Sequence, residues 1–337
     1  MKMNGSQILI QALIDQGVDT IFGYPGGSVL NIYDALYERS EDIRHIITSH
    51  EQGAAHAADG YARSTGKCGV CLATSGPGAT NLVTGIATAY MDSIPMVAIT
   101  GNVPNDLLGR DSFQEVNITG ITMPITKHNF IVQNVEDLAA VVRKAFVIAN
   151  SGRKGPVLID IPKDVTAAHS EYVKLPRYRI RKLPKVDDVV FEQALEVIRR
   201  AERPMIYAGG GIISSNATRE LMNFSRHMDI PICCSMMGLG SVPYDYDLYM
   251  GMLGMHGTPV SNYATLNTDL IIAIGSRFSD RVAGNREEFG REAKIIHFDI
   301  DASEISKNVA SDISIVGDAR YILKKMIQRM PETKHDD

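Results

Sequence analysis

The chain has 337 residues, of which 34 are Lys or Arg and 39 are Asp or Glu, giving a formal net charge of −5 at pH 7. Without a basic excess, a nucleic-acid partner is not expected. Apolar residues make up 45% of the chain and charged residues 22%, a mixture typical of a folded globular protein rather than a disordered one. At about 150 residues per domain, the length predicts two domains.

The compartment is predicted from the start of the chain and from the cysteines. Residues 1–6 lead into an amphipathic pattern rather than an apolar secretory core, and no apolar run approaches the roughly 18 residues of a membrane helix. The four cysteines (Cys68, Cys71, Cys233 and Cys234) lie in apolar segments that resemble buried strands. Since residues three apart on a strand, or adjacent, point to opposite faces, we expect buried thiols rather than a redox or zinc pair. We therefore predict a cytoplasmic protein with no membrane partner.

The first half of the chain alternates helices with short apolar strands. We expect helices at residues 4–17, 29–37, 51–64 and 79–90, and strands at 20–22, 44–49, 68–74, 95–100 and 155–161. Asn4 or Ser6 caps the first helix, and Gly17 ends it. Such alternation is typical of a parallel sheet covered by helices on both faces.

The alternation breaks between residues 167 and 188. This stretch contains Pro176 and Pro184 among several Lys and Arg residues. A nucleic-acid-binding arm is one interpretation, but Tyr172 and Tyr178 are the only aromatic residues available for stacking. We therefore predict a solvated linker between domains.

The alternation then restarts in the second half. Helices are expected at residues 189–201 and 318–330, and strands at 204–208, 230–233, 269–274 and 294–298. The predicted fold class is α/β, with two doubly wound parallel-sheet domains at residues 1–166 and 189–337.

Familiar nucleotide and hydrolase motifs are missing from the sequence. It contains no G-x-G-x-x-G, no G-x-x-x-x-G-K-[ST], no G-x-S-x-G and no H-E-x-x-H, which disfavours standard dehydrogenases, P-loop enzymes and zinc proteases. His50 and His56 are six residues apart and do not share a helix face, so no metal ligands are assigned.

Glycine turns follow several of the predicted strands, at residues 23–28, 75–78, 209–211 and 275–276. Open α/β sheets bind ligands at the carboxyl ends of their strands. A tight turn alone explains each glycine sterically, whereas their repetition points to a nucleotide-like ligand. Both interpretations stay open at this level.

Three groups of charged residues stand next to these turns. Glu51 begins a predicted helix, where it either interacts with the helix dipole or serves as an acid at the edge of a pocket. Residues 277–281 contain two arginines that suit a phosphate or carboxylate, or else form a solvated loop. Asp299 and Asp301 suit sugar hydroxyls or the cap of the next helix.

Longer sequence motifs are more specific for a protein family. Residues 22–28 (FGYPGGS), 49–63 (SHEQGAAHAADGYAR), 74–81 (TSGPGATN), 113–115 (FQE), 125–129 (ITKHN), 237–240 (MGLG) and 253–258 (LGMHGT) occur in this order. Together they resemble the catalytic subunit of acetolactate (acetohydroxyacid) synthase. The resemblance extends from about residue 4 to residue 325.

The resemblance implies a thiamine-diphosphate enzyme that joins pyruvate to a second 2-ketoacid, such as 2-ketobutyrate, with release of carbon dioxide. The first domain would bind the cofactor's aminopyrimidine ring, with Glu51 favouring its imino tautomer. Pro25, Pro77, Asn81 and Gln114 match positions around the cofactor, and Phe113 matches a position near the substrate channel.

By the same resemblance, the second domain would bind FAD in a structural rather than a redox role. The positions that match FAD contacts are Arg153, Gly209, Gly210, Gly211, His256, Gly257, Thr258, Gly275, Arg277, Asp280 and Asp299. Arg281 matches an arginine at the substrate entrance, with Asp280 near it. Ser279 departs from the family, which usually has aspartate there.

The family's third domain carries a Gly-Asp-Gly segment that holds magnesium and the cofactor diphosphate. No such segment occurs here, and Gly317-Asp318 continues with Ala319. We therefore expect the first two domains of a catalytic subunit that is inactive alone and binds Mg²⁺ through the missing domain. The resemblance also implies a homodimer or homotetramer, with a small regulatory subunit as a candidate partner.

Two alternatives remain. Sulfoacetaldehyde acetyltransferase and oxalyl-CoA decarboxylase are related thiamine-diphosphate enzymes that share the surroundings of Glu51, whereas glyoxylate carboligase lacks that glutamate. A non-catalytic module that binds FAD or another nucleotide is the second alternative.

Overall fold

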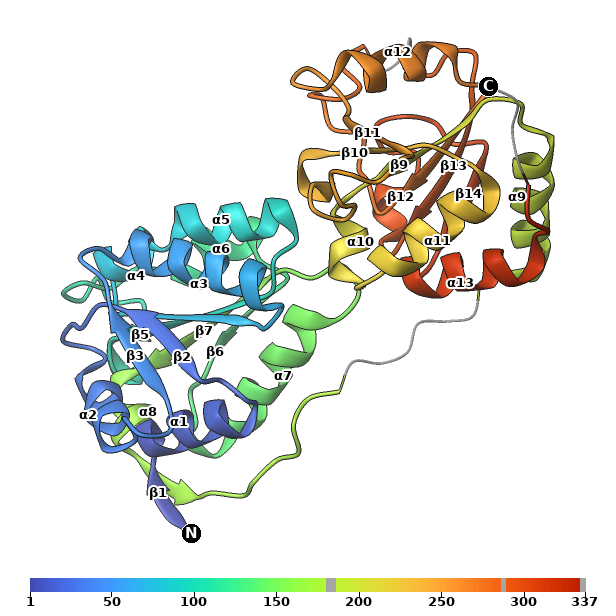
Figure 1. Ribbon diagram of the computed structural model, residues 1–337. Coiled ribbons are helices and arrows are strands. Elements are labelled where there is room, and N and C mark those ends of the chain that lie inside the picture. The colour runs from blue at the N-terminus through green and yellow to red at the C-terminus, as the bar shows by residue number, and fades with distance from the viewer. Residues whose placement is uncertain (180–185, 286–288, 334–337) are drawn as a thin grey trace. The chain divides into compact units, whose positions relative to one another are not determined.

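The computed structural model describes residues 1–179, 186–285 and 289–333. It divides into two compact units, Met1–Arg181 (unit 1) and Lys182–Asp337 (unit 2). Each unit is built around its own six-stranded parallel sheet (Figure 1). The predicted fold class, α/β with two parallel-sheet domains, is confirmed.

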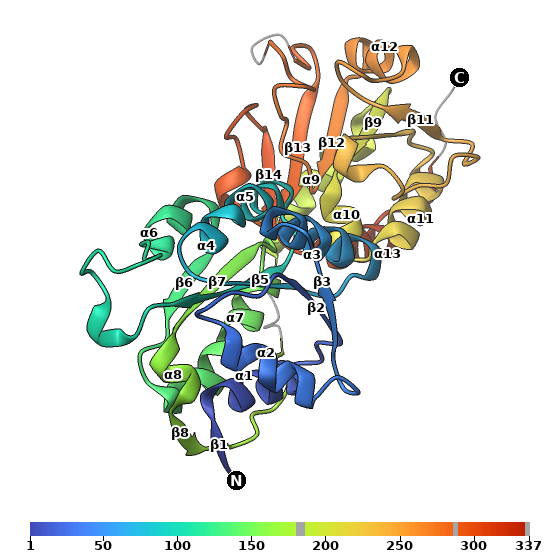
Figure 2. The same cartoon turned by 90° about the vertical axis from the view of Figure 1, so that its left-hand side faces the viewer.

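The sheet of unit 1 has the strand order β3-β2-β4-β5-β7-β6. Its strands are β2 (Thr20–Gly23), β3 (Arg44–Ile47), β4 (Gly69–Ala73), β5 (Met96–Asn102), β6 (His128–Ile131) and β7 (Pro156–Pro162). One face carries the helices α1 (Gly5–Asp15), α2 (Leu30–Glu38), α7 (Leu138–Asn150) and α8 (Lys163–Ala167). The other face carries α3 (Glu51–Thr65), α4 (Pro77–Asn81), α5 (Val83–Asp92) and α6 (Ile118–Thr122), as Figure 2 shows from a second side.

Strand β4 illustrates how the sequence fills both faces. Val70 and Leu72 belong to the core beneath α1, α2 and α7, whereas Cys71 and Ala73 belong to the core beneath α3 and α5. A strand buried on both faces is apolar throughout, which is why it was recognisable in the sequence. Burial raises the pKa of the Cys68 and Cys71 thiols to about 12. All four cysteines are free and buried, which confirms the prediction of buried thiols.

The sheet of unit 2 has the strand order β11-β10-β9-β12-β13-β14. Its strands are β9 (Pro204–Ala208), β10 (Ile232–Cys234), β11 (Tyr249–Met252), β12 (Leu270–Ile274), β13 (Lys294–Asp299) and β14 (Ile313–Val316). The helices α9 (Asp188–Arg200), α10 (Gly210–Ser214), α11 (Thr218–Met228) and α13 (Ala319–Arg329) cover the larger core. On the opposite face, loop residues such as Phe278 and Ala283 close a smaller core, and α12 (Pro259–Asn267) packs beside β11.

The observed elements differ from the predicted ones in several places, and α6, α8, α10, α11, α12, β11 and β14 have no counterpart in the prediction. The helix expected at residues 79–90 is two helices, α4 and α5, which meet at Leu82. Helix α7 and strand β6 were not predicted: α7 contains a Val-Val pair that also suits a strand, and β6 is a short edge strand of mixed polarity.

The predicted linker is partly attached to unit 1. Strand β8 (His169–Glu171) pairs antiparallel with β1 (Lys2–Asn4). Beyond it, the Tyr172 hydroxyl donates to Asp15 at 2.6 Å, and the Tyr178 ring stacks on Phe146. Residues 167–179 therefore lie along unit 1, because aromatic side chains among the charges find partners there. Residues 180–185 of the expected linker lie outside the described residues.

A polar cluster joins the amino ends of β2 and β4, which are neighbours in the sheet. Asp19 precedes β2 and accepts hydrogen bonds from the Lys67 ammonium, just before β4, and from the Tyr61 hydroxyl of α3. These hydrogen bonds, that of Lys67 above all, lower the pKa of Asp19 to about 2. The cluster ties two strands and a helix together at the amino edge of the sheet.

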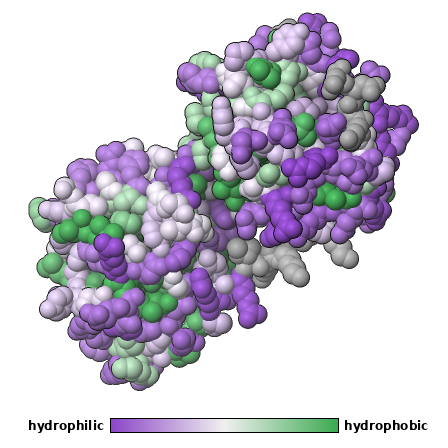
Figure 3. Space-filling model, in the orientation of Figure 1, coloured by the Kyte–Doolittle hydropathy of each residue, from purple (hydrophilic) through white to green (hydrophobic). Residues whose placement is uncertain are grey.

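Across the described part of the chain, no helix is long and apolar enough to cross a membrane. The face visible in Figure 3 is mostly hydrophilic, with separate apolar spots.

Candidate cofactor and substrate site

In unit 1, the turns after β2 and β4 lie at the switch point of the sheet. From β2 the strand order runs to β3 in one direction and to β4 and β5 in the other. The two turns are locked together: the Ser28 and Ser75 hydroxyl oxygens are 2.7 Å apart, and a Cβ on Gly26 would lie 2.5 Å from the Thr74 side chain. Ligands of open α/β sheets bind at this kind of position. Pro25 and Pro77 lie in these two turns.

Glu51 stands at the same edge of the sheet. It is the first residue of α3, whose N-cap is His50, and only 8% of it is exposed. The Asn81 amide donates to Glu51 Oε2 at 2.9 Å. A Cβ on Gly78 would lie 3.2 Å from Glu51 Oε1, so glycine leaves room beside that oxygen. Oε2 is thus fixed by Asn81, whereas Oε1 lies next to Gly78, which has no side chain.

Buried alanines and a polar aromatic pair also lie near Glu51. Ala54 and Ala55 in the next turn of α3 are fully buried. Tyr33 of α2 was not singled out in the sequence; burial first, and then the charge of Glu51, raise its pKa above the ordinary value. The Tyr33 hydroxyl lies 3.2 Å from His45 Nε2, and burial lowers the pKa of His45. Both shifts favour the uncharged forms of Tyr33 and His45, so this pair is polar but neutral.

The loop after β5 approaches the switch point from a third strand. A Cβ on Gly76, which has φ +58°, would lie 2.6 Å from the Gln114 carbonyl oxygen. Gln114 itself adopts a left-handed backbone, with φ 56°. Phe113 is 88% exposed. The structure therefore brings Glu51 and Asn81 together. The Gln114 backbone lies against the adjoining turn, and Pro25 and Pro77 lie in the two turns themselves.

Unit 2 also has glycine turns at the switch point of its sheet. Its switch point lies between β9 and β12, and these strands are followed by the turns at residues 209–211 and 275–276. The turns pack backbone to backbone: Gly211 N–H donates to the Gly275 carbonyl at 3.1 Å, and a Cβ on Gly209 would lie 2.1 Å from that oxygen. A Cβ on Gly210 would meet Met237 at 3.1 Å. Close packing of the two turns therefore accounts for Gly209, Gly211 and Gly275 without any ligand.

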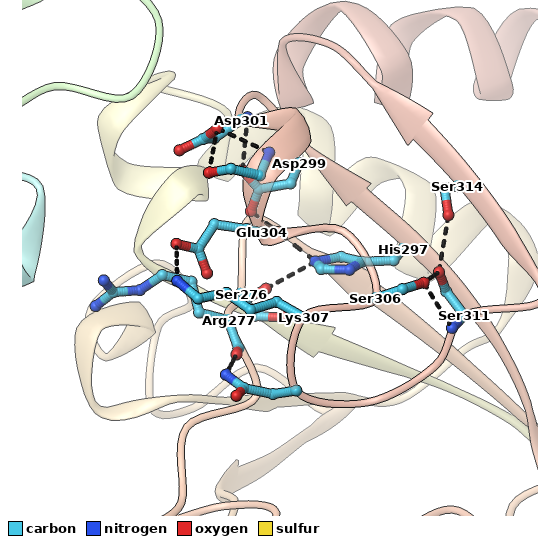
Figure 4. A network of polar contacts seen from close by, with 12 residues as sticks. Ser276, Arg277, His297, Asp299, Asp301, Glu304, Ser306, Lys307, Ser311 and Ser314 are labelled. Atoms are coloured by element: carbon cyan, nitrogen blue, oxygen red, sulfur yellow. Dashed lines mark hydrogen bonds and ion pairs between the residues drawn. The ribbon is translucent and has the colours of Figure 1, made fainter.

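A polar network next to these turns contains two unpaired buried atoms. His297 of β13 is fully buried, and its Nε2 lies 2.8 Å from the Ser276 carbonyl and 3.9 Å from Asp299 Oδ2 (Figure 4). Neither His297 Nδ1 nor Ser276 Oγ has a hydrogen-bond partner among the described residues. Burial lowers the pKa of His297, so the ring is neutral near pH 7. Both unpaired atoms lie close to the switch point of the sheet, the place where open α/β sheets bind ligands.

The other predicted contacts of unit 2 lie in two loops. Thr258 caps α12 and donates to the Met250 carbonyl at 2.6 Å, next to Gly257 and the exposed His256. Asp280 and Arg281 are both exposed, with 3.9 Å between Asp280 Oδ2 and Arg281 Nε. The Arg277 carbonyl accepts from Asn308.

Arg153 lies in unit 1, on the connection between α7 and β7. Its Nε donates to the Ser93 hydroxyl at 2.7 Å, and its guanidinium lies over the Tyr90 ring. Of the predicted nucleotide contacts, it is the one placed outside unit 2.

Within the described ranges, no group of three His, Cys, Asp or Glu side chains could hold a metal ion.

Comparison with protein families follows the same division of the chain. Residues 3–121 match the "Thiamine pyrophosphate enzyme, N-terminal TPP binding domain", and residues 191–326 match the "Thiamine pyrophosphate enzyme, central domain". The chain therefore belongs to the thiamine pyrophosphate (thiamine diphosphate) enzymes, and its first unit is of the cofactor-binding type.

Within that class, the chain is homologous to acetolactate synthase large subunits. It is 51% identical to a probable acetolactate synthase large subunit of Methanocaldococcus jannaschii, over 96% of this chain and 56% of the relative. It is 49% identical to the acetolactate synthase large subunit of Corynebacterium glutamicum, over 99% of this chain and 54% of the relative. It is 47% identical to the chloroplastic acetolactate synthase of Arabidopsis thaliana, over 96% of this chain and 48% of the relative. The chain thus spans about half the length of these relatives.

Proposed function

We propose that the chain carries two parts of an acetolactate synthase catalytic subunit: a pyrimidine-binding part (residues 1–166) and an FAD-binding part (residues 189–337). The reaction would decarboxylate pyruvate and join the remaining two-carbon unit to pyruvate or 2-ketobutyrate. One observation carries the proposal: a buried Glu51 carboxylate, fixed by Asn81 on one oxygen and facing Gly78 with the other, at the switch point of the sheet.

The residues around Glu51 fit the aminopyrimidine ring of thiamine diphosphate. When bound, this cofactor supplies a ring that stabilises the negative charge left by decarboxylation. Glu51 would share a proton with a ring nitrogen through Oε1, while the Asn81 amide keeps the carboxylate from rotating. The buried alanines Ala54 and Ala55 would keep water away from this hydrogen bond and strengthen it. Gln114, Pro25 and Pro77 would line the same pocket.

FAD is proposed for unit 2 in a structural role. The switch-point turns, the unpaired Ser276 Oγ and the Asp299 carboxylate at the end of β13 support a nucleotide with phosphate and ribose groups. The proposed FAD contacts on the loops are Arg153, Gly209, Gly210, Gly211, His256, Gly257, Thr258, Gly275, Arg277 and Asp280. Phe113 and Arg281 are proposed substrate residues.

The remaining assignments concern groups outside these contacts. Magnesium, which would neutralise the cofactor diphosphate, is proposed to be bound by residues other than those named here. A homodimer or homotetramer, with a small regulatory subunit, is the proposed assembly. The acetolactate synthase relatives favour this function over the sulfoacetaldehyde acetyltransferase and oxalyl-CoA decarboxylase alternatives, and over a non-catalytic nucleotide module.

The test is acetolactate formation from pyruvate by the protein expressed from its complete gene, with thiamine diphosphate, magnesium and FAD. Glu51→Gln keeps the size of the side chain and its acceptor for Asn81 but removes the shared proton. We expect activity to fall by at least about 100-fold, within the range for loss of a general acid–base group.

The matched control is Glu41→Gln, which removes the charge of an exposed glutamate and is expected to leave activity unchanged. Full activity of Glu51→Gln would contradict the proposed role of Glu51. Preferred turnover of sulfoacetaldehyde or oxalyl-CoA by the wild-type protein would contradict the proposed reaction.

A further inference from the structure

Glu115 closes the tip of the loop that follows β5. Its carboxylate accepts backbone hydrogen bonds from Gly109, from Arg110 at 3.3 Å and from Ser112 at 3.0 Å. Its own N–H donates to the Ser112 carbonyl at 3.0 Å. Successive backbone N–H groups that converge in this way form an anion-binding concavity. Here the anion is a side chain of the same loop.

The loop needs such an anchor because its backbone is strained. Gly109, Asp111 and Gln114 all have positive φ, at 74°, 52° and 56°. A left-handed backbone is unfavourable for residues other than glycine, and glutamine is not among the types that tolerate it well. Gly109 adopts this conformation freely and aspartate tolerates it, so Gln114 is the residue of the three that most needs compensating interactions. The three hydrogen bonds to Glu115 supply them, and they lower the pKa of this carboxyl.

The base of the loop is anchored separately. The Asn105 backbone N–H and side-chain amide donate to the two oxygens of Asp164, at 3.1 and 3.0 Å. Glu115 therefore controls the tip at residues 109–115 rather than the position of the whole loop.

The tip is linked to the surroundings of Glu51 through the backbone. The Gln114 carbonyl packs against Gly76, which caps α4, and α4 carries the Asn81 amide that holds Glu51. On the same tip, Phe113 is 88% exposed, so a large apolar side chain is presented to solvent on a loop closed by Glu115. Loop residues fixed in this way at a ligand-binding edge are characteristic of binding sites rather than of packing.

We propose that Glu115 is a positioning residue, which fixes the conformation of the tip that carries Phe113 and Gln114 and so contributes to the choice between 2-ketoacids at the site proposed around Glu51. The proposal rests on the function proposed above. Glu115 does not contact the substrate in this scheme; it acts through the shape of the tip.

The first test measures the loop itself. In Glu115→Gln and Glu115→Ala, hydrogen exchange at the amides of residues 109, 110 and 112 should become at least about tenfold faster, since hydrogen bonds to a charged acceptor are lost. Trypsin should cleave faster after the exposed Arg110. Glu136→Gln, at another exposed glutamate of unit 1, serves as the control and should change neither rate.

The second test measures selection. With pyruvate and 2-ketobutyrate in competition, both Glu115 variants should change the ratio of the two products by about tenfold, while the affinity for thiamine diphosphate stays within about twofold. A lower fraction of folded protein reduces both products equally and leaves this ratio constant.

The outcomes separate the two proposals. Unchanged amide exchange in both variants would overturn the closure of the loop by Glu115. Faster exchange with an unchanged product ratio would overturn its role in selection. Wild-type protein that forms neither product would overturn the proposed function, and the role in selection with it, while the exchange rates would still decide the loop closure.

Discussion

At the scale of single residues, glycine decides how closely three loops approach Glu51. Gly26, Gly76 and Gly78 each occupy a position where a Cβ would meet a neighbouring group within 2.5–2.6 Å. The neighbour is the Thr74 side chain for two of them and the Gln114 carbonyl for Gly76. Since a backbone carbonyl cannot rotate away as a side chain can, Gly76 is the least replaceable of the three.

Gly76→Ala tests this. Its φ of 58° with ψ of −120° is unfavourable for alanine, and the new Cβ would collide with Gln114. We expect unit 1 to lose about 1–3 kcal/mol of unfolding free energy, measured by urea denaturation. Gly27→Ala in the neighbouring turn, where a Cβ meets nothing within 4 Å, should change it by less than about 0.5 kcal/mol. Equal losses in the two variants would show that the contact with Gln114 carries no energy.

The sequence predicted part of this site. Glu51 is recognisable because a glutamate follows a strand and begins an alanine-rich helix, and the glycine turns mark the two edges at which ligands are proposed to bind. Gln114 and Phe113 came only from the family resemblance, and Glu115 was not assigned. Its role depends on three backbone N–H groups that converge after the chain has adopted strained angles, and no local pattern encodes that.

At the scale of elements, the pairing of β5 with β7 contains a buried carboxylate. Asp160 of β7 is 1% exposed, and it accepts hydrogen bonds from the Thr100 hydroxyl at 2.7 Å and the Asn102 amide at 2.6 Å. Burial raises the pKa of Asp160 to about 6, against the opposing effect of these two donors. The central strands therefore hold an acid that is easier to protonate in the folded state than in the unfolded chain.

This predicts a pH dependence of stability. Because the pKa is 3.8 in the unfolded reference and about 6 in the folded protein, the contribution of Asp160 is fully present below pH 4 and is lost as the pH rises through 6. Asp160→Asn can keep both partners by accepting from Asn102 and donating to Thr100. We expect the difference in unfolding free energy between variant and wild type to change by roughly 3 kcal/mol between pH 4 and pH 7, in favour of the variant at high pH.

The control for this titration is Asp106→Asn, at an exposed aspartate. Urea denaturation at half-unit pH steps measures both differences. A flat difference for Asp160→Asn across this window would mean that the carboxyl is not perturbed by burial.

The order of the strands is the part of the fold that the sequence could not provide. The central strands of both sheets are recognisable as apolar runs, whereas β11 and β14 are not predicted, and the adjacency of β2 with β4 and of β9 with β12 is a property of the crossover connections. This adjacency creates the two switch points. The short edge strand β6 and the pairing of β1 with β8 were missed, because their stability comes from neighbours rather than from their own composition.

At the scale of the whole molecule, each unit has its own sheet and its own cores. No residue of the two largest apolar clusters is shared between them. Two such units are expected to unfold as separate cooperative transitions.

Calorimetry with and without FAD tests both this independence and the proposed nucleotide site. At an FAD concentration 100 times its dissociation constant, the transition of unit 2, which supplies all the proposed FAD contacts except Arg153, should be stabilised by about 2.7 kcal/mol. Gly76→Ala should shift only the transition of unit 1. A single transition would contradict independent units, and an unshifted unit 2 transition in the presence of FAD would contradict the proposed nucleotide site.

The ion pair between Asp19 and Lys67 has a practical consequence for protein engineering. It joins β2 and β4 at their amino ends, whereas the turns with Pro25 and Pro77 leave the same two strands at their carboxyl ends. The amino rim of the sheet thus secures the scaffold, and the opposite rim is available for variation apart from Gly26, Gly76 and Gly78. A mutant library can be confined to the turns and screened for new substrates. Substitutions at the amino rim can then restore the stability lost in that search without changing the turns.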